Sequence, residues 1–157
     1  MRLRRSKKSN PRVLAVSSGG GHWVQLLRLR PAFEGCRVSY VTVRRSYATD
    51  LKGERLFVIN DATRWEKLDL LRMAAKLAWI LVRVRPHVIV STGAAPGYFA
   101  IRFGKLLGAK TVWLDSIANV EQLSMTGELV GQRADLWLTQ WPHLARENGP
   151  KYEGAVI

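Results

Sequence analysis

The chain has 157 residues, which is enough for one domain with its own hydrophobic core and too few for two domains of ordinary size. Hydrophobic residues make up 47% and charged residues 24%, which excludes a disordered or low-complexity chain. The 25 Lys and Arg residues outnumber the 12 Asp and Glu residues and give a formal net charge of +13. This excess indicates an anionic partner, which could be a nucleic acid, an anionic membrane surface or a phosphorylated substrate.

Short strands and helices alternate along the chain. The composition and spacing of apolar residues predict strands over residues 12–17, 37–43, 56–60, 87–91, 110–115 and 135–139, and helices over residues 22–30, 64–85, 98–107 and 127–133. Nearly continuous apolar strands that alternate with helices are typical of a parallel sheet covered on both faces. The sequence therefore predicts a Rossmann-like α/β domain over residues 12–142, between a basic arm (residues 1–11) and a C-terminal segment (residues 143–157).

No export signal or membrane span is predicted. The apolar run that follows the basic arm is too short for the core of a signal peptide. The most apolar helical stretch lies between Leu68 and Val84, and charged residues interrupt it. Cys36 is the only cysteine, which fits a reducing compartment. We therefore expect a cytoplasmic protein that is at most peripheral to a membrane.

In parallel sheets of this kind, ligands bind at the carboxyl ends of the strands. Three loops are expected there, at residues 17–22, 91–97 and 115–121, and all are rich in glycine, small or hydrogen-bonding residues. Their convergence on one edge of the sheet predicts the ligand site. No metal is expected in it, because the three histidines lack the spacing of metal ligands.

The first loop reads Ser-Ser-Gly-Gly-Gly-His and leads into a helix. Its glycines allow backbone N–H groups to approach a phosphate, and the helix N-terminus favours negative charge. The candidate substrate-binding residues of this loop are Ser18, Gly19, Gly20 and Gly21. His22 is the candidate general base, because the helix dipole favours its neutral form. Val24 breaks the dinucleotide-binding pattern G-x-G-x-x-G, and the alternative for the loop is a plain tight turn.

The other two loops supply weaker candidates. Thr92, Gly93, Ala94 and Gly97 could lie against a ligand, or could form an ordinary strand-to-helix turn. In the third loop, Asp115 and Glu121 could act as bases or bind sugar hydroxyls, with Asn119 as a further substrate contact. The alternatives are that Asp115 caps a helix and that Glu121 is a solvated side chain.

The helix over residues 64–85 has a charged stripe beside a wide apolar arc. Part of this arc must pack on the core, but its width also fits a helix that lies on a membrane surface. The candidate membrane-contacting residues are Arg4, Arg5, Arg72, Lys76, Leu77, Trp79 and Leu81. The basic arm would add about 1 kcal/mol per Lys or Arg near an anionic surface. The arm could instead be solvated or bind RNA, although it lacks the aromatic residues of an RNA-binding segment.

The C-terminal segment ends in the uncharged run Gly-Ala-Val-Ile. Exposed apolar residues gain nothing from contact with water, so residues 152–157 are expected to dock on a partner protein. The alternative is a frayed terminus.

Four segments together resemble a known family. Residues 18–22 (SGGGH) are similar to the glycine-rich loop that opens GT-B glycosyltransferases of the MurG type. Residues 86–97 (PHVIVSTGAAPG), 115–127 (DSIANVEQLSMTG) and 134–142 (ADLWLTQWP) resemble segments of the acceptor-side subunit of split, two-protein enzymes of this type. That group includes the membrane-recruiting subunit of the eukaryotic dolichol-linked N-acetylglucosaminyltransferase and the bacterial PssD-type exopolysaccharide proteins. Asp115, Ala118 and Asn119 depart from the eukaryotic pattern and favour the bacterial branch.

The resemblance implies the N-terminal half of a GT-B enzyme, working with a separate donor-binding subunit. It implies inverting transfer from a UDP-sugar to a polyprenyl-diphosphate-linked acceptor, without a cofactor, on the cytoplasmic face of the inner membrane. His22 would deprotonate the acceptor hydroxyl, with Asp115 and Glu121 in supporting roles. The alternative hypothesis is a non-catalytic module that recruits its partner to the membrane. No nucleic-acid partner is expected.

Overall fold

The computed structural model describes residues 10–157, so the candidate membrane residues Arg4 and Arg5 lie outside the described part. Within it, seven parallel strands form one sheet in the order β3-β2-β1-β4-β5-β6-β7. The strands are β1 (Arg12–Val16), β2 (Arg37–Thr42), β3 (Arg55–Val58), β4 (Val88–Ser91), β5 (Lys110–Leu114), β6 (Leu136–Thr139) and β7 (Lys151–Tyr152). The predicted Rossmann-like architecture is confirmed.

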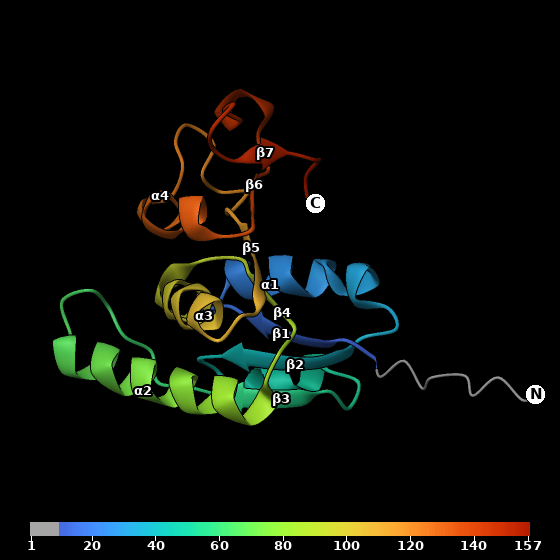
Figure 1. The fold of residues 1–157 in the computed structure, drawn as a ribbon, viewed down its shortest axis with the longest axis vertical. Coiled ribbons are helices and arrows are strands. Elements are labelled where there is room, and N and C mark those ends of the chain that lie inside the picture. The colour runs from blue at the N-terminus through green and yellow to red at the C-terminus, as the bar shows by residue number, and fades with distance from the viewer. Residues whose placement is uncertain (1–9) are drawn as a thin grey trace, which may run out of the picture.

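Helices cover both faces of the sheet, and Figure 1 shows α2 alongside β2 and β3 at one end and α4 near β6 at the other. The α-helices are α1 (Gly21–Arg28), α2 (Lys67–Val84), α3 (Ala94–Leu106) and α4 (Met125–Val130). The 3₁₀ helices are η1 (Arg30–Phe33), η2 (Arg45–Asp50), η3 (Gly131–Arg133) and η4 (Pro142–Leu144). Helix α3 therefore begins four residues earlier than predicted, with Pro96 in its first turn, where a missing N–H costs nothing.

Side chains that alternate along each strand divide the core into two layers. On β1, Leu14 and Val16 pack on the face covered by α2 and α3, where buried residues of these helices such as Met73 and Ile101 meet them. Val13 and Ala15 face the opposite layer, which α1 and η1 cover. The sheet is thus buried on both faces, which accounts for the apolar strands of the sequence.

Two of the membrane predictions for α2 are wrong. Leu77 and Leu81 are fully buried in the core, because the helix turns them toward the sheet together with Met73 and Ile80. The other predicted contacts, Arg72, Lys76 and Trp79, are exposed. Among residues 10–157, no helix combines the length and the apolar character needed to cross a membrane.

The C-terminal segment adds strand β7, which the sequence analysis did not predict, to the edge of the sheet. Beyond β7, the backbone N–H of Val156 donates to the Gln140 side chain at 2.8 Å. The Val156 carbonyl accepts a hydrogen bond from Arg28 at 3.1 Å. Part of residues 143–157 therefore packs on the domain itself.

Asp135 joins three elements at the start of β6. One carboxylate oxygen accepts from the backbone N–H of Thr111 at 2.8 Å, and the other pairs with Lys105 on α3 at 2.8 Å. The hydrogen bond from Lys105 is the main cause that lowers the pKa of Asp135 to about 2. Burial opposes this shift, and the two hydrogen bonds from Thr111 lower the pKa further.

Asp135→Ala is expected to lower the free energy of unfolding at pH 7 by about 1 kcal/mol, a modest value because the carboxylate is partly exposed. The folded pKa lies below the unfolded value of 3.8, so this contribution is present above about pH 4 and is lost as pH falls toward 2. Urea unfolding of both proteins across this range checks the prediction. If the wild type and Asp135→Ala differed in free energy of unfolding by the same amount at pH 7 and at pH 2, the Asp135 carboxylate would not have this role.

Candidate functional site

The three candidate loops follow neighbouring strands of the sheet. β1, β4 and β5 are adjacent, and the loops after Val16, Ser91 and Leu114 leave them at the same carboxyl edge. The chain leaves β1 for α1 on one face of the sheet and leaves β4 for α3 on the other. This divergence is the topological switch point at which open α/β sheets bind their ligands.

Two hydrogen bonds join His22 to Thr92 of the second loop. Its Nδ1 lies 2.7 Å from the carbonyl oxygen of Thr92, and the Thr92 hydroxyl donates to the His22 carbonyl at 2.7 Å. A carbonyl oxygen only accepts, so Nδ1 carries the proton in this bond. In the neutral ring, Nε2 is then the unprotonated nitrogen. The geometry therefore provides the tautomer that a general base acting through Nε2 requires.

Gly93 makes room for this histidine. A Cβ atom on Gly93 would lie 2.6 Å from Cε1 and 2.7 Å from Nδ1 of His22, and its φ of +135° is one that side chains rarely adopt. Thr92 itself is fully buried. The structure thus assigns Thr92 and Gly93 to holding His22 in place. Gly97 also has a packing role, because a Cβ there would collide with the side chain of Ser91 on β4.

Two residues that the sequence analysis missed lie against the glycine loop. The Tyr47 hydroxyl accepts a hydrogen bond from the backbone N–H of Gly20 at 2.9 Å. The Arg44 Nε lies 3.2 Å from the place a Cβ of Gly19 would occupy. The guanidinium and the N-terminus of α1 together favour a phosphate at this point. Arg44 follows β2 at the carboxyl edge, and that position was the signal that could have identified it.

Asp115 organises the third loop. It is 2% exposed, and its carboxylate accepts hydrogen bonds from the backbone N–H groups of Ser116 and Ser124 and from the Asn119 side chain. These three donors occupy a carboxylate that faces its own loop, which gives Asp115 a positioning role. Asn119 is half-buried, whereas Glu121 is exposed on the same loop.

Buried glutamines connect this loop to helix α1, which carries His22. Gln140 donates to the Gln25 side chain at 2.6 Å and to the Asp115 carbonyl at 2.9 Å. Gln25, one turn after His22 on α1, donates to the Ser116 hydroxyl and accepts from the backbone N–H of Ile117. Such amides are tolerated in a core only when they are hydrogen-bonded. Because Gln140 also bonds Val156, the network links α1 and the third loop to the C-terminal residues.

Comparison with known proteins finds relatives along most of this chain. The family model described as "Oligosaccharide biosynthesis protein Alg14 like" matches residues 68–156. The chain is 27% identical over 185 aligned residues to the UDP-N-acetylglucosamine transferase subunit ALG14 of Yarrowia lipolytica, covering 99% of this chain and 85% of the relative. It is 26% identical to the subunit of that name from Mus musculus, covering 93% of this chain and 83% of the relative.

Solved structures share the fold at low sequence identity. MurG of Acinetobacter baumannii superimposes with a TM-score of 0.75 at 12% identity, covering 90% of this chain and 45% of that chain. UDP-N-acetylglucosamine 2-epimerase from Rickettsia bellii gives a TM-score of 0.69 at 12% identity, covering 94% and 45%. The chain therefore spans less than half the length of either protein.

Proposed function

Because this chain belongs to the family of Alg14-like oligosaccharide biosynthesis proteins, we propose that it is the acceptor-side subunit of a two-protein UDP-sugar transferase. The curated relatives are named as UDP-N-acetylglucosamine transferase subunits, which favours UDP-N-acetylglucosamine as the donor. The polyprenyl-diphosphate-linked acceptor would bind at the carboxyl edge of the sheet. The contact between His22 and Thr92 carries the proposal, because it orients a histidine as a general base there.

In the proposed reaction, Nε2 of His22 accepts the proton of the acceptor hydroxyl. The hydroxyl oxygen attacks the anomeric carbon of the sugar, the bond from that carbon to the diphosphate breaks, and UDP leaves with inversion. Arg44 and the N-terminus of α1 would hold a phosphate of the acceptor or the donor. Asp115, Gln25 and Gln140 would position the loops rather than contact the reacting atoms, because their side chains bond one another and the loop backbone.

The second subunit would hold the donor, and the C-terminal residues are the proposed contact with it. Ile157 is 88% exposed, although Val156 is anchored to Gln140. The two-subunit proposal is tested by co-expressing this chain with a donor-binding GT-B half. Transfer from UDP-N-acetylglucosamine to a polyprenyl-diphosphate acceptor should need both chains, and transfer by either chain alone would contradict the two-subunit proposal.

Deleting residues 154–157 is expected to abolish co-purification with the partner. The deletion also leaves the buried Gln140 oxygen without its donor, so the melting temperature should fall by about 2–8 °C. Affinity co-purification and thermal unfolding measure the two effects. Arg28→Ala supplies a matched control, because it removes a hydrogen bond to the end of the chain without removing the residues themselves. An intact complex after the deletion would place the interface elsewhere.

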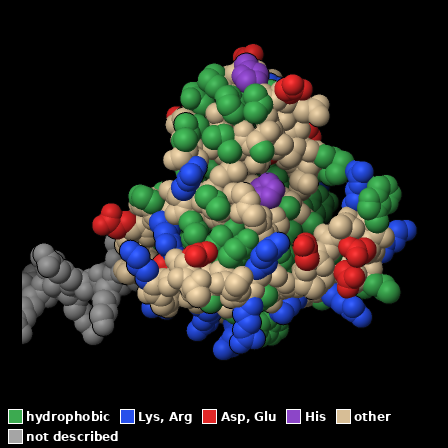
Figure 2. All heavy atoms as spheres, turned by 180° about the vertical axis from the view of Figure 1, so that it is seen from behind, with side chains coloured by type: hydrophobic (Ala, Val, Ile, Leu, Met, Phe, Trp, Pro, Cys, Tyr) green, Lys and Arg blue, Asp and Glu red, His purple; other side chains and the backbone are tan. Residues whose placement is uncertain are grey.

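We also propose that α2 rests on an anionic membrane. Its exposed apolar side chains include Leu68, Leu71, Trp79 and Val82, which form one stripe opposite the buried side of the helix. Arg72 and Lys76 are exposed beside this stripe. Figure 2 shows Lys and Arg side chains concentrated at the end of the molecule that Figure 1 assigns to α2 and β3. An apolar stripe flanked by cations fits the headgroup region of a bilayer.

The double variant Leu68→Gln/Leu71→Gln should bind anionic vesicles about tenfold or more weakly, because both side chains lose apolar contact with lipid. Leu106→Gln/Leu129→Gln, which changes two exposed leucines elsewhere, is the control. Vesicle sedimentation at low and high salt separates the apolar contribution from the electrostatic one. Equal binding by both variants would argue against contact through α2.

The rival function, a non-catalytic module that recruits its partner to the membrane, has a distinct test. If recruitment is the whole role, tethering the partner artificially to the membrane should restore transfer in the absence of this chain. If His22 is the base, the tethered partner should stay inactive.

A further inference from the structure

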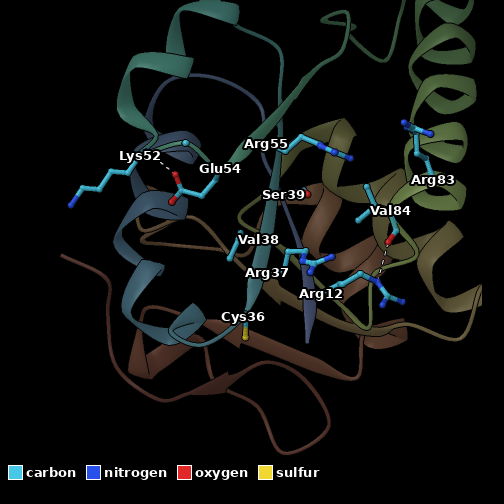
Figure 3. Close-up of a pocket in the computed structure, with 11 residues that line it drawn as sticks. Arg12, Cys36, Arg37, Val38, Ser39, Lys52, Glu54, Arg55, Arg83 and Val84 are labelled. Carbon is cyan, nitrogen blue, oxygen red and sulfur yellow. Dashed lines mark hydrogen bonds between the residues drawn. The ribbon is translucent and has the colours of Figure 1, made fainter. Parts of the chain in front are cut away.

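A cluster of arginines lines a pocket at the amino edge of the sheet, whereas His22 lies at the carboxyl edge. The amino ends of β1, β2 and β3 and the last turn of α2 border a pocket of about 720 Å³. Figure 3 shows Arg12, Arg37 and Arg55 extending from the strands toward the end of α2, which carries Arg83. β1 alone is five residues long, which separates the pocket from the carboxyl edge by roughly 16 Å or more. The pocket is therefore independent of the proposed transferase site.

Strand register puts these arginines side by side. Arg12 on β1 pairs with Arg37 on β2, and Ser39, two residues further along β2, pairs with Arg55 on β3. Because residues two apart on a strand share a face, all three arginines project from the face that α2 covers. Like charges directly opposite one another on neighbouring strands destabilise a sheet. This arrangement costs stability unless an anion neutralises it.

The protein supplies little negative charge here. Of the described residues that line the pocket, only Glu54 has a carboxylate, and it accepts a hydrogen bond from the backbone N–H of Lys52 at 2.6 Å. Among residues 10–157, none of the four arginines takes part in an ion pair. Residues 1–9 contain no Asp or Glu, so they offer no carboxylate side chain.

Two of the guanidinium groups have contacts that restrict their position. Arg12 donates through Nε to the carbonyl oxygens of Val84 at 3.1 Å and Arg85 at 2.8 Å, which also satisfies the end of α2. Its two terminal nitrogens make no hydrogen bond within the described part of the chain. Arg55 lies over the Phe57 ring, with its Cζ 5.8 Å from the ring centroid. A guanidinium that is already positioned loses less entropy when it binds an anion.

We propose that this pocket binds a phosphate group, held by Arg12, Arg37 and Arg55 with Arg83 at its rim. Guanidinium groups pair with phosphate oxygens through parallel charged hydrogen bonds, and converging arginines suit the tetrahedral distribution of charge on a phosphate. The phosphate could belong to a soluble metabolite or to the headgroup of a lipid, because both present the same oxygens to the pocket.

The test compares Arg37→Gln/Arg55→Gln with Arg102→Gln/Arg133→Gln, which removes the same charge from a different surface. Thermal unfolding of the full chain is followed with inorganic phosphate at constant ionic strength, and sedimentation is followed with vesicles of phosphatidylcholine with or without phosphatidic acid. Either phosphate or phosphatidic acid should bind the wild type and the control variant alike and bind the pocket variant at least tenfold more weakly. Without phosphate, the pocket variant should melt no lower than the wild type, because repulsion among the arginines is relieved.

Each outcome has a distinct meaning. Stabilisation by inorganic phosphate that only the pocket variant loses supports a soluble ligand, and selective loss of phosphatidic-acid binding supports a lipid headgroup. Equal responses of the two variants would show general charge screening and overturn the proposal. So would a pocket variant that melts well below the wild type without phosphate, since the arginines would then stabilise the fold by themselves. Binding of single-stranded RNA alone, with neither phosphate source bound, would also overturn it.

Discussion

Replacing His22 with alanine is expected to reduce sugar transfer by the assembled two-subunit enzyme by a factor on the order of 10² or more. The substitution removes the nitrogen that would accept the acceptor's proton but leaves the loop backbone and the donor-binding partner intact. The loss should fall on kcat rather than on KM, because a general base acts mainly in the transition state. Steady-state transfer rates with both subunits present measure the effect.

His143→Ala is a suitable control, since His143 is exposed and its ring has one hydrogen-bond partner among residues 10–157, the Val120 carbonyl. It should leave the rate within about twofold of the wild type, as surface substitutions usually do. Co-purification and the melting temperature must be checked for His22→Ala, because the ring also joins two loops. A folded, assembled His22→Ala enzyme with a near-normal rate would contradict the role of base and favour the recruiting module.

Gly93→Ala is also expected to reduce sugar transfer, because it displaces His22 instead of removing it. The new methyl group would overlap the His22 ring at 2.6 Å, so the ring must move from the Thr92 carbonyl or the loop must shift. The φ of +135° adds backbone strain. We expect transfer to fall at least tenfold and the free energy of unfolding to fall by about 2–4 kcal/mol.

The control for strain alone is Gly108→Ala. Gly108 also has a positive φ, of +79°, but nothing lies within 4 Å of its would-be Cβ. This variant should lose about 1 kcal/mol of stability and keep its transfer rate. Transfer rates and chemical unfolding compare the two glycines. Equal losses of activity in both variants would mean that displacement of His22 is not the cause.

Much of the fold follows from local sequence. Apolar strands alternating with helices predict a parallel sheet, and the loops after β1, β4 and β5 then have to meet at its carboxyl edge. The glycine loop before His22 could also be predicted from local sequence, because a strand, a turn and a helix follow one another within a few residues. β7 was missed because two residues are too short to give a periodic pattern.

The sequence by itself determined the alternation of elements, the basic charge and the edge at which the candidate site lies, because these depend on residue type and short-range periodicity. Only the tertiary structure decided which side of α2 is exposed, burying Leu77 and Leu81 and leaving Trp79 outside. It also brought Thr92 to His22, Gln140 to Gln25 and Arg37 to Arg12, pairs whose members are 70, 115 and 25 residues apart. Strand order, register and helix rotation fix such contacts by minimising the free energy of the whole core, and no local window of sequence contains that information.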